Sequence, residues 1–176
     1  MNISIFAEGA QTTADAEEGV IAKHYFQGLF EPISNLEQEI SKYAETELHI
    51  LSDEFGYLKG ETPIQEIASK NASSEESMEE FANAIVSAGK TADIIVVLLS
   101  ASSFKNTVGS RWDDILSTAQ KNTTWCFGAS KGALDAIDIP ALESKVKNII
   151  IYQRAGVAPI GRETRTQLLN IVREGN

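Results

Sequence analysis

The sequence predicts an α/β fold, a three-layer Rossmann-like sandwich with a mostly parallel five-stranded sheet. Short apolar segments of strand character alternate with amphipathic helical segments from one end of the chain to the other. The most apolar segment, residues 93–99, is short and rich in β-branched side chains, as expected of a strand covered by helices on both faces. Because helical crossovers join the strands, we expect the strands to run parallel.

The length and composition indicate a single domain over residues 1–176, long enough to bury one core. A formal net charge of −10 disfavours nucleic acid as a partner, because an acidic surface is repelled by the phosphate backbone. Cys126 is the only cysteine, and no apolar run approaches the roughly 20 residues that span a bilayer. The first residues lack the basic start of a signal peptide. We therefore expect a cytoplasmic protein with no membrane partner.

The elements of the first quarter follow from alternation and from helix signals. Residues 2–7 alternate apolar and polar side chains, which predicts a strand followed by a polar loop. Asp15 is expected to cap a first helix that Pro32 ends. Ser34 and Glu37 then form a capping-box pattern, which predicts a second helix.

A second strand is predicted at residues 47–51, where it leads into a polar segment. Residues 59–74 are expected to form a long irregular crossing with one short turn at 64–68, because Gly, Pro and Ser accumulate there. Ser73 and Glu76 are expected to open the amphipathic helix that follows.

After the central strand, Trp112 and Ile115 lie on one face of a predicted helix that Ser110 and Asp113 are expected to cap. The remaining predicted elements are a fourth strand (123–127), a short helix (133–137), a fifth strand (148–152) and a last helix with its apolar residues at 168–172.

Ligands of parallel α/β sheets bind outside the carboxyl ends of the strands, so the loops there carry the functional expectation. Small and hydroxylated residues recur in these loops, where close backbone approach and hydrogen bonds to a polar ligand require them. Each such residue on its own is also typical of ordinary turns and helix caps. The predicted ligand-binding residues are Glu8, Gly9, Thr12, Ser52, Ser100, Ser102, Ser103, Lys131 and Arg154.

Candidate catalytic residues follow the second strand. Asp53, Glu54 and Tyr57 place two carboxyl groups and a phenol close together in the sequence, which suits general acid–base work if the loop folds inward. The alternative is a solvated charged turn. No cofactor is expected, because the glycine-rich dinucleotide fingerprint and the phosphate-loop lysine pattern are absent. No metal site is expected either, since His24 and His49 have no partner at ligand spacing and Cys126 suits a buried strand position.

Two segments, Ala22-Lys-His-Tyr-Phe-Gln-Gly-Leu-Phe30 and Leu48-His-Ile-Leu-Ser-Asp-Glu-Phe-Gly-Tyr-Leu58, resemble the YaaA-like proteins. In that family a Tyr-x-Gly-x-x-Phe-like helix end precedes a strand that finishes in Leu-Ser-Ala-x-x-Gly-Leu. The chain departs from the pattern where Asp53-Glu54 replaces a small residue followed by a basic one, and where the first loop lacks its serine–lysine character. The resemblance implies pocket or scaffold roles for Tyr25, Gly28, Ser52, Gly56 and Tyr57.

Three functions are consistent with these observations. The first is binding of a small nucleotide, nucleoside or sugar-base compound at the strand-end cleft, with hydrolase or transferase chemistry if the carboxyl groups act there. The second is a non-catalytic interaction module that works through a protein partner or as a homo-oligomer. The third, implied by the resemblance alone, is a stress-response or nucleic-acid modification and repair role.

Overall fold

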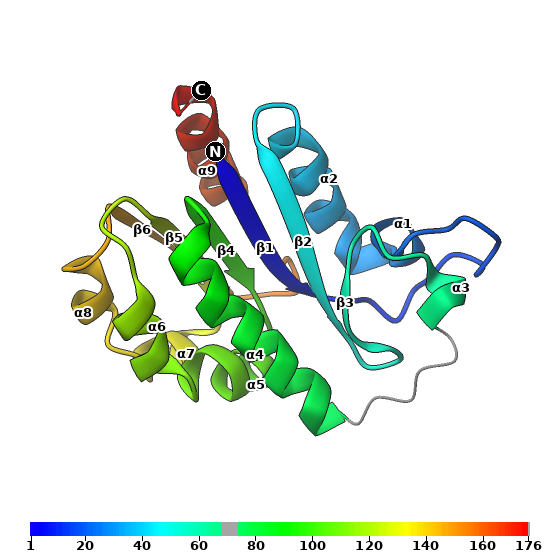
Figure 1. Ribbon diagram of the computed structural model, residues 1–176, viewed down its shortest axis with the longest axis horizontal. Coiled ribbons are helices and arrows are strands. Elements are labelled where there is room, and N and C mark those ends of the chain that lie inside the picture. The colour runs from blue at the N-terminus through cyan, green and yellow to red at the C-terminus, as the bar shows by residue number, and fades with distance from the viewer. Residues whose placement is uncertain (68–73, 176) are drawn as a thin grey trace.

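The computed structural model describes residues 1–67 and 74–175. They form an α/β domain around a mixed, mostly parallel six-stranded sheet in the order β3-β2-β1-β4-β5-β6 (Figure 1). The strands are β1 (Asn2–Glu8), β2 (Glu45–Ser52), β3 (Gly56–Lys59), β4 (Ile94–Leu98), β5 (Thr124–Ala129) and β6 (Asn148–Gln153). All five predicted strands are confirmed within two residues at each end, as β1, β2, β4, β5 and β6.

The prediction of five strands is wrong by one, because the chain turns back after β2 and adds β3 antiparallel to it. Ser52 pairs with Gly56, and His49 pairs with Lys59. The Ser52 hydroxyl accepts hydrogen bonds from the backbone amides of Glu54 (3.1 Å) and Phe55 (3.2 Å), which closes the turn. Gly56 has a φ of 74°, a value that side chains disfavour, so a glycine suits the return to β3.

Helices cover both faces of the sheet. Those of the N-terminal third and the C-terminal helix share one apolar cluster with the sheet, and the remaining helices share the other (Figure 1). The first group is α1 (Ala22–Tyr25), the short 3-10 helix η1 (Gly28–Phe30), α2 (Glu31–Ile40), α3 (Ile64–Ile67) and α9 (Arg162–Glu174). The second group is α4 (Ser74–Thr91), α5 (Ala101–Phe104), the π-helical turn η2 (Lys105–Gly109), α6 (Trp112–Thr118), α7 (Lys131–Asp135) and α8 (Ile139–Glu143).

Two helix predictions in the first quarter are wrong. The first helix is only the single turn α1, and residues 15–20 form loop and turn instead of helix. Pro32 does not end a helix but lies in the first turn of α2, where its missing amide hydrogen costs nothing. Ser34 therefore lies inside α2 and caps nothing, and Glu37 accepts a hydrogen bond from the Ser41 hydroxyl at 3.0 Å.

The other helix predictions are confirmed in part. The predicted turn is present as α3, and its last residue, Ala68, lies outside the described residues, as does the predicted cap Ser73. The helix predicted around Trp112 is α6, but Ser110 does not cap it, because the Ser110 hydroxyl donates back to the carbonyl of Asn106 at 2.8 Å. The short helix and the last helix are present as α7 and α9.

The strand order places a switch point between β1 and β4. Both strands run parallel and pair directly, with Ala7 opposite Leu98, while the chain connects β1 outward to β2 on one side and β4 outward to β5 on the other. Connections that diverge in this way leave a crevice at the carboxyl ends of the two strands. Glu8 ends β1 and Ser100 follows β4, so both residues lie at this crevice.

Within residues 1–67 and 74–175, none of the helices combines the length and the apolar composition that a membrane span requires.

Candidate functional site

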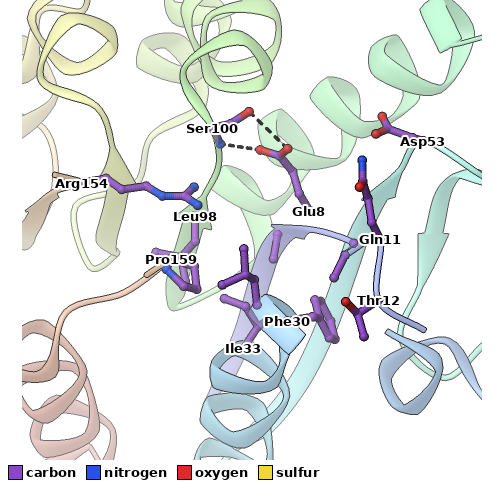
Figure 2. A pocket seen from close by; sticks show the side chains of 14 residues that line it. Glu8, Gln11, Thr12, Phe30, Ile33, Asp53, Leu98, Ser100, Arg154 and Pro159 are labelled. Atoms are coloured by element: carbon purple, nitrogen blue, oxygen red, sulfur yellow. Dashed lines mark hydrogen bonds between the residues drawn. The ribbon is translucent and has the colours of Figure 1, made fainter. Parts of the chain in front are cut away.

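A cavity of about 440 Å³ lies at the switch point, outside the carboxyl ends of β1 and β4 (Figure 2). We call it the switch-point cavity. Its lining comes from the end of β1 and the loop after it, from η1 and the start of α2, from the end of β4, and from the loops after β2, β4 and β6. The lining residues are Ala7, Glu8, Gly9, Ala10, Gln11, Thr12, Leu29, Phe30, Ile33, Asp53, Leu98, Ser100, Arg154 and Pro159.

Glu8 joins the two central strands at this point. Its carboxylate accepts a hydrogen bond from the backbone N–H of Ser100 and another from the Ser100 hydroxyl, the latter at 3.2 Å (Figure 2). Because Ser100 immediately precedes α5, the carboxylate of Glu8 lies where the amide groups of a helix start would otherwise attract an anion. The protein thus supplies its own anion at the switch point.

The floor of the cavity is apolar. Phe30, Ile33 and Leu98 are almost completely buried and line it together with Pro159. Gly128 in β5 permits this packing, because a Cβ atom there would lie 2.6 Å from Leu98 Cδ2 and 3.1 Å from the carbonyl oxygen of Pro159. A flat ring of a ligand would find van der Waals partners on this floor.

The walls of the cavity are polar on opposite sides. Arg154, from the loop after β6, donates a hydrogen bond to the carbonyl of Val157 at 3.0 Å and lines one end. Gln11 and Asp53 lie at the other end (Figure 2). The loop that carries Gln11 is fixed by the amide of Gln27, which donates to the carbonyl of Thr12 at 2.9 Å.

A smaller chamber of about 210 Å³ adjoins the switch-point cavity and shares Glu8 and Asp53 with it. We call it the acidic chamber. It lies between the β2–β3 turn, the first turns of α4 and the segment after β4. Its lining residues are Glu8, Leu51, Ser52, Asp53, Glu54, Gly56, Ser74, Ser77, Met78 and Ser103.

The structure brings most of the predicted site residues together. Those that line the switch-point cavity are Glu8, Gly9, Thr12, Asp53, Ser100 and Arg154. Those that line the acidic chamber without reaching the larger cavity are Ser52, Glu54 and Ser103. The predicted residues that line neither space are Tyr57, Ser102 and Lys131.

The predicted catalytic trio is divided by the β2–β3 hairpin. The Tyr57 hydroxyl lies 2.7 Å from His49 Nδ1 and its ring packs against Phe81 of α4, away from the cavity. Glu54 accepts a hydrogen bond from the Tyr25 hydroxyl at 3.2 Å. Asp53 is therefore the member of the trio that faces both spaces, and its catalytic role stays a prediction.

Lys131 does not line the cavity and forms a local ion pair instead. It begins α7, is exposed, and its Nζ lies 3.4 Å from a carboxylate oxygen of Asp135 one turn later. Among the described residues no group of three or more His, Cys, Asp or Glu side chains could hold a metal ion. Cys126 lies buried in β5, and burial raises the pKa of its thiol to about 12.

The positions implied by the YaaA-like resemblance have structural surroundings of their own. Tyr25 is buried and holds Glu54 beside the acidic chamber. Gly28 has a φ of 61° and lies against Thr12, where a Cβ atom would come within 3.3 Å of the Thr12 side chain. Ser52 and Gly56 build the hairpin turn. These contacts support scaffold roles, and membership of that family stays untested.

Sequence reasoning missed the apolar floor and three polar lining residues, Gln11, Ser74 and Ser77. Leu29, Phe30 and Ile33 come from the segment that was expected to be the end of one helix and the start of another, so their spacing pointed only to a helical core. Ser77 was hidden inside an amphipathic helix, where a serine is ordinary. No signal in the sequence distinguishes it from the other serines of that helix.

Comparisons of the chain with protein families, with curated proteins and with solved structures find no match.

Proposed function

We propose that the chain is a Rossmann-like small-molecule-binding protein whose switch-point cavity takes a nucleoside or a related sugar-base compound. The observation that supports this proposal most directly is the composition of the cavity: an apolar floor beside two carboxylates. Aromatic and aliphatic groups such as Phe30 and Leu98 accommodate a planar base, and the carboxylates of Glu8 and Asp53 accept hydrogen bonds from sugar hydroxyls.

The position of Glu8 favours a nucleoside over a nucleotide. Its carboxylate already fills the amide-rich point beside Ser100, and a phosphate placed there would meet a like charge at close range. Arg154 is the cation of the cavity lining, and it lies across the cavity from Asp53 (Figure 2). A ligand without phosphate therefore suits the charges of the cavity better.

Thermal denaturation in the presence of nucleosides tests the proposal. At a concentration one hundred times the Kd, a nucleoside is expected to stabilise the protein by about 2.7 kcal/mol, which corresponds to a rise in Tm of about 5–10 °C. Adenosine, guanosine, cytidine and uridine are compared with their 5′-monophosphates, and each nucleoside is expected to bind more tightly than its monophosphate. The absence of stabilisation by all four nucleosides at millimolar concentration would reject the proposal.

A charge-neutral variant assigns the effect to the cavity. Glu8→Gln keeps the length of the side chain and removes the carboxylate charge, so the preference for nucleosides over monophosphates should fall about tenfold. Glu18 is exposed in a loop, so Glu18→Gln removes the same charge away from the cavity and should leave the preference for nucleosides over monophosphates unchanged.

Hydrolase or transferase chemistry at the same cavity is the second candidate. The observation that favours it is that Glu8 and Asp53 both line the cavity, which provides two carboxyl groups for acid–base work on a glycosidic bond. Release of free base from a bound nucleoside, followed by chromatography, tests it, and Asp53→Asn should abolish the release while retaining binding.

A further inference from the structure

The two edges of the sheet differ in how they are protected. β3 forms one edge, has only four residues and ends in Lys59, which forms an ion pair with Glu47 of β2. A short strand and a lysine are features by which native proteins prevent an edge from pairing with another chain. β6 forms the other edge (Figure 1). Its six residues, Asn-Ile-Ile-Ile-Tyr-Gln, include no charged residue, no glycine and no proline, so this edge lacks such protection.

The backbone of β6 presents hydrogen-bonding groups to its outer side. The amides of Asn148 and Arg154 donate to backbone carbonyls on the β5 side, at 3.4 and 2.7 Å. In a parallel strand, the amide and carbonyl of one residue point to the same side, and the side alternates from each residue to the next. The residues that point their amides and carbonyls away from β5 are therefore Ile149, Ile151 and Gln153. In the described part of the chain, no strand pairs with this outer side.

An exposed apolar side chain lies at the centre of this edge. Ile150 is 3% exposed, because it points into the apolar cluster that includes α9. Ile149 packs against the cluster on the opposite face, and Ile151, two residues further along the strand, points to the same face but is 39% exposed. Single exposed apolar residues are common on protein surfaces. Ile151 is different because it lies beside a row of unpaired backbone groups, and pairing there would cover both.

The geometry of β6 fits a second copy of the same strand. A twofold axis at Ile151 places two copies of β6 antiparallel, with Ile151 opposite Ile151 of the second copy and Ile149 opposite its Gln153. All three outward amides of each copy then donate to carbonyls of the other, and all three outward carbonyls accept. The axis also brings the two exposed Ile151 side chains together. No outward backbone group of β6 is left without a partner in this register.

The charges around β6 also fit a second copy. In the same register Lys147 lies opposite Ala155, and Arg154 lies opposite Asn148, so no two like charges are directly opposite each other. The side-chain oxygen of Asn148 is an acceptor that suits the guanidinium group across from it. The whole chain has a net charge of −10, so two copies repel each other over most of their surfaces. An uncharged strand flanked by Lys147 and Arg154 is where an acidic second copy meets the least repulsion.

We propose that β6 is a self-association edge through which two copies of the chain pair antiparallel and form one continuous sheet. Each copy contributes a single strand, so the interface is smaller than the roughly 800 Å² per partner that stable complexes bury. The dimer is therefore weak, with a Kd on the order of 0.1 mM. The proposal does not depend on nucleoside binding in the switch-point cavity.

Sedimentation and hydrogen exchange of the full-length protein test the pairing. The weight-average mass should rise toward that of a dimer between about 50 µM and about 1 mM protein. Over the same range, NMR should show about threefold slower exchange with water at the amides of Ile149, Ile151 and Gln153, because the monomer fraction falls by about that factor. The amides of Ile150 and Tyr152 point toward β5, so their exchange should not depend on concentration.

Two substitutions at the axis test the register. Ile151→Lys places two like charges opposite each other and should raise the Kd at least about tenfold. Ile151→Pro removes an amide that faces away from β5, a position where an edge strand tolerates proline, and should also abolish the dimer. Ser87→Lys, on the exposed side of α4, adds the same charge away from β6 and should leave the Kd unchanged.

Each outcome decides the proposal. A monomer at about 1 mM protein would overturn it. A dimer in which the three outward amides exchange at the same rate at both concentrations forms through another surface, which would equally refute the pairing of β6. The same conclusion would follow if Ile151→Lys and Ile151→Pro both dimerised as the parent chain does.

Discussion

A buried histidine should make the stability of this protein depend on pH. His49 in β2 stacks on Phe6 with ring centroids 4.3 Å apart, and its Nδ1 lies 2.7 Å from the Tyr57 hydroxyl. Its Nε2 lies 3.6 Å from a carboxylate oxygen of Glu47. Burial lowers the pKa of His49 to about 4, against the opposing attraction of Glu47 and with a smaller contribution from Lys59. The folded protein therefore holds His49 in its neutral form.

The sign and size of the effect follow from these two pKa values. The unfolded chain binds a proton at His49 below its ordinary pKa of 6.5, whereas the folded protein binds it only below about 4. Stability is therefore lost as the pH falls from 6.5 toward 4. The interval between the two pKa values corresponds to about 3 kcal/mol in total, of which about 2 kcal/mol is lost by pH 5.

A double substitution should remove this dependence without removing the packing. His49→Phe with Tyr57→Phe keeps two stacked rings beside Phe6 and deletes both partners of the hydrogen bond, an exchange that is often nearly neutral. Denaturant unfolding, followed by circular dichroism at pH 7, 6, 5 and 4, gives the free energy of unfolding of each protein. The stability of the double variant, relative to the parent chain, should rise by about 3 kcal/mol on going from pH 7 to pH 4.

His24 provides the control, because it is the other histidine and is exposed in α1. His24→Asn should retain the pH dependence of the parent chain. Parallel pH profiles for the parent and the double variant would refute the assignment to His49, and so would a flattened profile in His24→Asn.

Three further predictions concern packing. Gly128→Ala should lower the free energy of unfolding by about 1–3 kcal/mol, because its Cβ would overlap Leu98 and the Pro159 carbonyl. Gly132→Ala in α7, which has open space around it, should raise the free energy of unfolding by about 0.5–1 kcal/mol in the same denaturation assay. The Cys126 thiol should react with Ellman's reagent at pH 8 only after unfolding in guanidinium chloride, since it is buried and its pKa is raised to about 12; immediate labelling of the native protein would contradict this. Ser77→Ala should stabilise the ligand-free protein by about 1 kcal/mol more than Ser87→Ala does, because only Ser77 buries an unpartnered hydroxyl; an equal or smaller gain would contradict it.

The parallel strands could be predicted because a strand buried on both faces has a continuous run of apolar residues in the sequence. Every residue of β4 is buried, and its run of Ile, Val and Leu is recognisable without any partner strand. β3 has no such apolar run, since Leu58 is the only one of its four residues that is buried. Its pairing depends on the turn that Ser52 and Gly56 form, and the same residues are typical of a polar loop.

The helix starts were harder to predict because the same residues serve two roles. Proline is found both after the ends of helices and in their first turns, and here the backbone already has helical geometry at Phe30, the last residue of η1, and at Glu31. The capping-box spacing of Ser34 and Glu37 then occurs by chance within α2. Glu37 instead forms an ion pair with Lys23, whose Nζ lies 3.4 Å from the Glu37 carboxylate. The two residues are 14 positions apart, so the spacing within one helix does not predict this contact.

The site was predictable where it depends on topology and not where it depends on packing. Strand-end loops gather at one edge in any parallel sheet, so the grouping of Glu8, Ser100 and Arg154 follows once the strands are known. The hydrogen bonds from Ser100 to Glu8 depend on which two strands are neighbours, and the pattern of apolar residues does not predict the strand order. The separation of Tyr57 from Asp53 depends likewise on the hairpin that β3 forms.

The charge at the switch point is the main argument for a ligand without phosphate. Where a strand end is neutral, the amides of the next helix attract anions, and such sites bind phosphate. In this chain β1 ends in Glu8, whose carboxylate takes the amide of Ser100 for itself, and Asp53 and Glu54 follow at the neighbouring strand. The net charge of −10 adds a long-range field of the same sign. Local contacts and overall charge thus act together against phosphorylated ligands, which supports the proposal of a nucleoside in the switch-point cavity.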